Sequence, residues 1–102
     1  MSAKYEFTAE NEDNGCWIYE LQCLDAGLVV GRHQLRLSWE DYDLWVPDGS
    51  IEPAHVADAL MRYISQSEHF QPMPSKVDSS HPRRIDPDAD AAISGMIRSR
   101  GF

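Results

Sequence analysis

The large side chains in the first half of the chain occupy alternate positions, with polar residues between them. A period of two places such residues on one face of a β-strand, and agreement of that face across turns specifies how strands pair. The pattern therefore predicts strands with one apolar and one polar face. The positions on the apolar face are Tyr5, Phe7, Trp17, Tyr19, Leu21, Cys23, Val29, His33, Leu35, Leu37 and Trp39, and then, with the parity switched, Tyr42, Leu44 and Val46.

The turns between these strands set the expected register. Residues 25–27 predict a three-residue turn, with glycine where the backbone needs a positive φ. This turn pairs Tyr19 with His33. A second turn after Trp39 makes residues 42–46 the fourth strand of an antiparallel sheet.

The segment from Pro53 to about Ser67 carries apolar residues at helical spacing, led by Val56, Leu60 and Ile64. Positions three and four apart form one stripe of an α-helix, and a sheet with an apolar face needs such a cover. We therefore expect this helix to pack across the sheet. The predicted fold class is α+β: a four-stranded antiparallel β-meander with one helix packed on one face and a short C-terminal helix.

The character of the chain changes after position 70, where prolines and serines replace the regular apolar pattern. This composition disfavours regular structure. Farther on, Asp86 resembles a helix cap, and Ile93 and Ile97 supply a short apolar stripe. We therefore divide the chain into an α+β core domain, residues 1–70, and a flexible linker with a short C-terminal helix, residues 71–102.

The 102-residue chain holds 17 acidic and 9 basic residues, which gives a net charge of −8. Because nucleic-acid phosphates require a clustered basic surface, this balance argues against a nucleic-acid partner. The charge is uneven: residues 1–75 carry 13 acidic side chains against 4 basic ones, and residues 76–102 carry 4 against 5. We expect the arginines of the tail either to be solvated or to lie on the acidic body of the same chain.

The sequence also bears on where the protein works. No stretch approaches the length of a membrane span, and the N-terminal residues lack the apolar core of a leader peptide, so we expect a cytoplasmic protein without a membrane partner. Cys16 and Cys23 lie about 23 Å apart on one predicted strand and face opposite sides. They cannot bridge each other, and free thiols fit a reducing compartment.

Metal and cofactor chemistry finds little support in the residue spacing. Asp86, Asp88 and Asp90 have the spacing of the first three ligands of an EF-hand loop. The match fails at Ala91, where glycine is needed, and at Ile97, where a glutamate is needed. Histidine, cysteine and glycine spacings match neither a transition-metal site nor a phosphate loop. We therefore expect no metal and no cofactor, and a metal-responsive protein is the weakest of the functional interpretations.

His33 is the one candidate for general acid or base chemistry. The expected register places it on the inner face beside Tyr19, where a titratable group under the helix could serve a substrate. A histidine in such a place is more often a core residue bonded to a tyrosine hydroxyl or a carbonyl oxygen. We assign no catalytic residue. A small-molecule-binding protein or enzyme, with a pocket between sheet and helix near Tyr19 and His33, remains the alternative function.

The preferred interpretation is a small non-enzymatic protein-interaction or regulatory module. The expected register points Trp45 outward on an edge strand, together with Arg36 and beside the acidic residue Asp43. An exposed indole among acids is a common ingredient of interfaces, so Arg36, Asp43 and Trp45 form the predicted partner-binding site, for another protein or a second copy. The competing interpretation is that Trp45 stacks on Arg36 or is covered by the C-terminal helix.

Overall fold

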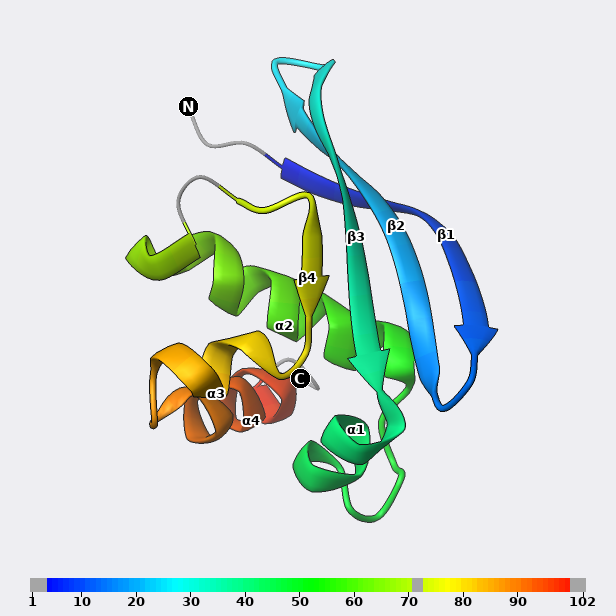
Figure 1. Ribbon diagram of the computed structural model, residues 1–102, viewed down its shortest axis with the longest axis vertical. Helices are drawn as coiled ribbons and strands as arrows, with labels where there is room; N and C mark the ends of the chain where they lie inside the picture. Colours follow the sequence, from blue (N-terminus) through cyan, green and yellow to red (C-terminus); the bar gives the residue numbers. More distant parts are fainter. Residues whose placement is uncertain (1–3, 71–72, 100–102) are drawn as a thin grey trace.

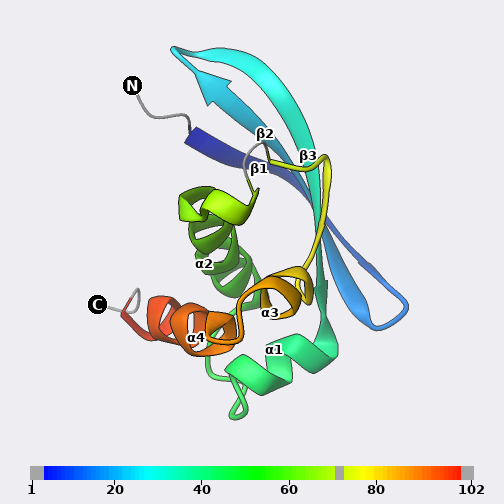
Figure 2. The same cartoon turned by 60° about the vertical axis from the view of Figure 1, so that its left-hand side comes forward.

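The fold consists of a curved sheet with helices packed against one of its faces (Figures 1 and 2). The computed structural model describes residues 4–70 and 73–99. The strand order is β1-β2-β3-β4. The elements are β1 (Lys4–Asp13), β2 (Cys16–Asp25), β3 (Leu28–Ser38), α1 (Trp39–Trp45), α2 (Pro53–Gln66), the short 3-10 helix η1 (Glu68–Phe70), β4 (Lys76–Asp78), α3 (His81–Ile85) and α4 (Ala89–Ser99).

The turn between β2 and β3 has two residues, so the predicted three-residue turn is wrong. Ala26 and Gly27 both adopt a positive φ, of 54° and 82°, as the twist of a tight hairpin demands. The shorter turn shifts the register by one residue, and an irregularity between Cys23 and Leu24 shifts it by one more. Tyr19 therefore pairs with Leu35 rather than with His33. Because the total shift is even, residues beyond the irregularity, such as Tyr19 and Leu35, keep their predicted faces. Val29, which pairs with Leu24 before the second shift, does not: it is 43% exposed instead of lying on the apolar face as expected.

The predicted fourth antiparallel strand is wrong as well, because residues 39–45 form α1. The hydroxyl of Ser38 accepts the backbone N–H of Asp41 at 3.1 Å, and acidic residues occupy the first turn of the helix. This cap satisfies a donor at the helix start and complements the helix dipole. Rotation through a helix sends Trp45 into the core, at 2% exposure, and leaves Leu44 outside, at 57%.

The fourth strand of the sheet comes instead from β4, which pairs in parallel with β3 from Gln34 to Arg36. The sheet is therefore mixed and is not a purely antiparallel meander. Residues 76–78 and 81–85, which we expected to lack regular structure, form β4 and α3. Part of the expected linker, residues 71 and 72, lies outside the described residues. The division of the chain at residue 70 stays a prediction, and the expected short C-terminal helix is present as α4.

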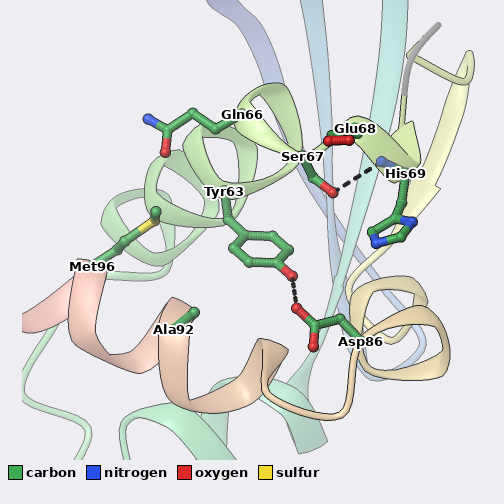
Figure 3. Close-up of a pocket in the computed structure, with 8 residues that line it drawn as sticks. All are labelled: Tyr63, Gln66, Ser67, Glu68, His69, Asp86, Ala92 and Met96. Atoms are coloured by element: carbon green, nitrogen blue, oxygen red, sulfur yellow. Dashed lines mark hydrogen bonds between the residues drawn. The ribbon is translucent and has the colours of Figure 1, made fainter.

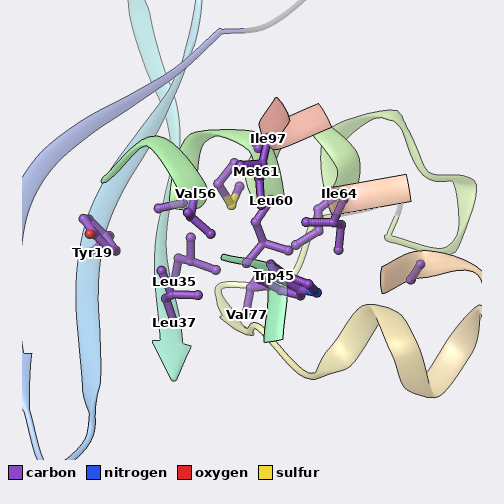
Figure 4. Close-up of a cluster of buried hydrophobic side chains, with 14 of the residues drawn as sticks. Tyr19, Leu35, Leu37, Trp45, Val56, Leu60, Met61, Ile64, Val77 and Ile97 are labelled. Carbon is purple, nitrogen blue, oxygen red and sulfur yellow. The ribbon is translucent and has the colours of Figure 1, made fainter. Parts of the chain in front are cut away.

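The core lies between the sheet, α2 and α4 (Figure 4). The predicted stripe of α2 is confirmed, since Val56, Leu60 and Ile64 are fully buried. Ile93 and Ile97 of α4 are also fully buried, so the C-terminal helix closes the side of α2 that the sheet leaves open. The buried cluster comprises Tyr19, Leu21, Leu35, Leu37, Trp45, Val46, Val56, Ala57, Ala59, Leu60, Met61, Ile64, Phe70, Val77, Ala89, Ile93 and Ile97.

A polar network ties α1 to the C-terminal helices. The guanidinium of Arg83 lies 2.7 Å from a carboxylate oxygen of Asp41 and donates two hydrogen bonds of 3.0 Å to Asp90. The Ser79 hydroxyl donates to Asp41 at 2.6 Å, and the indole N–H of Trp45 donates to Asp90 at 2.9 Å. The basic residue Arg83 therefore lies on the acidic body of the chain, and the C-terminal helix covers Trp45, as the competing interpretation expects.

Truncation of Leu37 to alanine should lower the free energy of unfolding by about 2 to 5 kcal/mol, because it removes a fully buried side chain. Leu44→Ala is the matched control: Leu44 is exposed on α1, and its truncation should change the free energy by less than about 0.5 kcal/mol. Urea unfolding followed by circular dichroism measures both. An equally large loss for Leu44→Ala would contradict α1 and restore the antiparallel strand.

The hydrogen bonds from Arg83 hold the pKa of Asp90 below its usual range. Such a carboxyl stabilises the fold above about pH 4, and the contribution is lost as the pH falls through the folded-state pKa. We expect Asp90→Asn to lower the free energy of unfolding by about 1 kcal/mol at neutral pH, since the pair is partly exposed. The variant should also lose less stability than the parent chain on acidification.

Urea titrations at several pH values between neutrality and strong acid measure this difference. Asp43→Asn is the control for the loss of one negative charge, because Asp43 is exposed on the same helix that Arg83 contacts. If the parent chain and Asp90→Asn declined in parallel on acidification, the Arg83 network would not contribute as argued.

Candidate interaction surface

The first half of β3 forms a free edge of the sheet. β3 pairs with β2 along its whole length, but β4 begins beside it only at Gln34. Within the described residues, no strand pairs with Leu28–His33 on that side. The hydrogen bond from the Gln34 N–H to the Ser75 carbonyl oxygen, at 2.8 Å, marks the point where this coverage starts.

The backbone of this edge is oriented to accept another strand. The N–H of Gln34 and the carbonyl oxygen of Arg36 both bond to the β4 side, the latter accepting from the Ser79 N–H at 2.8 Å. Because backbone groups alternate with a period of two along a strand, Arg32 presents its own N–H and C=O toward the same side. An unpaired row of this kind is a template for strand addition.

The same segment exposes apolar side chains. Leu28, Val29 and Val30 are 69%, 43% and 62% exposed, and they follow one another directly after the turn. Figures 1 and 2 show this hairpin projecting beyond the helices, so that no helix packs over its tip. Consecutive exposed apolar residues at a strand edge mark an interaction site more strongly than scattered ones. We call Leu28–His33 the β3 edge.

The opposite edge of the sheet is protected. β1 is a ten-residue strand whose exposed positions carry repeated acids, and charges on an edge strand discourage pairing with another chain. Residues 25–33, from the last residue of β2 to the end of the β3 edge, hold one acid, Asp25, and one base, Arg32, and are therefore neutral in a chain of net charge −8. The acids that protect β1 are Glu6, Glu10, Glu12 and Asp13.

The structure does not bring the predicted partner-binding residues together. Trp45 does not point outward as we expected: it is 2% exposed, because its helical conformation turns the indole into the core. Asp43 is exposed on α1, whereas Arg36 is exposed on β3, where its guanidinium donates to the Cys16 thiol at 3.2 Å. That bond raises the pKa of Arg36. A contact site at Arg36 and Asp43 stays a prediction, but Trp45 offers it no surface.

The two residues of the alternative site, Tyr19 and His33, differ in their bonding. His33 has a backbone partner, whereas the buried Tyr19 hydroxyl has no hydrogen-bond partner within the described residues. A ring nitrogen of the half-buried His33 lies 2.7 Å from the carbonyl oxygen of Pro74, which is the core role considered above. Tyr19 is 2% exposed, and burial raises the pKa of its hydroxyl. The cavity beside Tyr63, the cavity beside Tyr5 and the cavity beside Asp41 are lined by neither Tyr19 nor His33. A pocket there stays a prediction.

The sequence pattern did not reveal the β3 edge, because the alternation of apolar and polar positions was extended through every residue after the turn. Leu28, Val29 and Val30 are three apolar residues in succession, and one face of a regular strand can take only every second one. The run was therefore a sign that apolar side chains would remain outside the core. The irregular pairing of β3 with β2 next to Val29 is consistent with that sign.

A second surface feature is a groove of about 450 Å³ between the end of α2, η1 and α4 (Figure 3). The hydroxyl of Tyr63 donates to a carboxylate oxygen of Asp86 at 3.0 Å across it. The backbone N–H of Asp88 donates to the other oxygen, and this bond is the main reason that the pKa of Asp86 is lowered. Burial, more than the bond to Asp86, raises the pKa of Tyr63.

Other comparisons add little to these two features. In residues 4–70 and 73–99, no group of three or more His, Cys, Asp and Glu side chains is placed to hold a metal ion. None of the described helices is both long and apolar enough to cross a membrane. Models of known protein families, curated proteins and solved structures gave no significant match to the chain.

Proposed function

We propose that the chain is a non-enzymatic protein-interaction module that self-associates through the β3 edge. The observation that supports the proposal is the coincidence of unpaired strand edge and exposed apolar side chains at Leu28, Val29 and Val30. Backbone groups at such an edge gain hydrogen bonds when a strand is added, and the apolar side chains lose contact with water. Two copies related by a twofold axis satisfy both needs with one surface.

An antiparallel arrangement of the two β3 edges fits the shape of the chain. β4 covers β3 only from Gln34 onward, toward one end of the strand. In an antiparallel pair centred near Val30, the covered ends of the two strands point in opposite directions. Each copy's β4 therefore stays clear of the other copy, and the two acidic bodies lie at opposite ends of the joint sheet.

The charges of the hairpin are complementary in the same arrangement. Asp25 lies at the turn and Arg32 lies near the far end of the edge. Antiparallel pairing places the Arg32 end of one copy beside the turn of the other, where Asp25 is located. Opposite charges that meet across an interface fix its register and orientation more than they add affinity.

The interface is short, because only six residues of each copy are free to pair. It falls in the size range of weak and transient complexes, for which we expect a dissociation constant of about 10 to 100 µM. The net charge of −8 on each copy opposes association at long range. Added salt screens that repulsion and leaves the apolar contacts intact.

The test is sedimentation velocity of the whole chain over a range of about 5 to 500 µM. We expect a monomer–dimer equilibrium that Val30→Lys shifts at least tenfold toward the monomer, because the substitution places two like charges in the paired edge. Leu44→Lys is the matched control: it also replaces an exposed apolar residue, but on α1, and should leave the equilibrium unchanged.

The salt dependence separates this proposal from association with a basic partner. Dimerisation through a neutral apolar edge should strengthen between about 50 mM and 500 mM NaCl, whereas binding driven by opposite charges should weaken. A wild-type chain that remains monomeric at every concentration and salt level would overturn the proposal. An equal effect of Val30→Lys and Leu44→Lys would also overturn it, since association would then depend on net charge rather than on the β3 edge.

A further inference from the structure

The groove between α2, η1 and α4 combines an apolar wall with a charged rim. The ring of Tyr63, Ala92 and Met96 form the wall, while Asp86 and Glu68 lie on the rim (Figure 3). The residues come from separate parts of the chain and are brought together by the packing of α4 against α2. A concave site with an apolar wall and a few converging polar groups is typical of binding sites for small ligands.

The polar groups of this groove favour a positive ligand. Asp86 and Glu68 carry carboxyl groups, and no Lys or Arg side chain is among the residues that line the groove. The low pKa of Asp86 keeps this group ionised. An anion placed here would meet two carboxyl groups and no Lys or Arg side chain.

The two hydrogen bonds that Asp86 accepts orient its carboxylate but do not occupy all of its acceptor positions. One oxygen accepts the Tyr63 hydroxyl and the other accepts the Asp88 N–H. A carboxylate offers about four acceptor positions, so each oxygen retains capacity for a donor from a ligand. The bond from Tyr63 also fixes the aromatic ring beside the carboxylate. An aromatic ring next to a carboxylate favours an organic cation, which can make a cation–π contact with the ring and a charge-assisted hydrogen bond with the carboxylate.

We propose that this groove binds an organic cation, a guanidinium or alkylammonium group carried on a short apolar chain. The charged head lies against Asp86, and the apolar chain lies along Tyr63, Ala92 and Met96. The cation can belong to a free small molecule or to an arginine or lysine side chain of another protein. The proposal is independent of self-association, because the groove lies outside the β3 edge.

The experiment is an NMR titration of the ¹⁵N-labelled chain with butylguanidinium, followed by N-acetylarginine amide. Butylurea is the control ligand, since it has nearly the same shape and no charge. We expect saturable shifts around Tyr63 and Met96 with the cations, and at least tenfold weaker binding of butylurea. Preference for N-acetylarginine amide over butylguanidinium assigns the site to a side chain of a partner, and the reverse preference assigns it to a small molecule.

The variant Asp86→Asn should weaken binding of butylguanidinium about tenfold, because it removes the charge and keeps an oxygen that can accept the Asp88 N–H. Asp88→Asn is the matched control, as it removes a neighbouring negative charge that does not line the groove. Thermal unfolding verifies that both variants remain folded. Equal affinity for butylguanidinium and butylurea, equal effects of the two substitutions, or no saturable shift at millimolar ligand would each overturn the proposal.

Discussion

The cap at Ser38 is the local interaction on which the architecture depends. By accepting the Asp41 N–H, the Ser38 hydroxyl ends β3 and begins α1, so the chain leaves the sheet where a third hairpin would otherwise form. The far side of β3 is then open, and β4 can pair there in parallel after the chain has crossed through α1 and α2. Since β4 is only three residues long, it does not reach Leu28–His33, and no other described strand pairs with that side of β3. The mixed sheet and the part of β3 that β4 leaves unpaired both follow from the end of β3 at this cap.

The path of the chain through α1 points the indole of Trp45 toward the C-terminal helices, and this buried indole requires a hydrogen-bond acceptor. Trp45 fills the core with its ring and needs an acceptor for its N–H, which Asp90 supplies. Arg83 neutralises Asp90 and the buried Asp41 together, so that neither carboxylate faces the core without a counter-charge. The uneven distribution of charge along the sequence has its structural basis here: a basic residue of the tail lies between acids of α1 and α4.

The residues that were predicted well are those whose position depends on a local period. The alternation along β2 and β3 assigns Tyr19 and Leu35 to the core face, and this assignment survives a register error of two residues because two is even. The parallel pairing of β4 was not predictable from local pattern, since three residues carry no recognisable period and their partner lies about forty positions away. The sequence SWED did carry a helix-start signal, but the alternation of Tyr42, Leu44 and Val46 competed with it.

The two surface features differ in how a sequence could disclose them. The β3 edge has a sequence signal, the run Leu28, Val29 and Val30, because three successive apolar residues exceed what one strand face can bury. The groove at Tyr63 and Asp86 has none, since its residues are separated along the chain and meet only after α4 has docked on α2.

An edge with apolar side chains promotes aggregation unless strand pairing is limited, and here the acids of β1 discourage pairing at the other edge of the sheet. Pairing restricted to one edge closes after two copies and does not continue into a fibre.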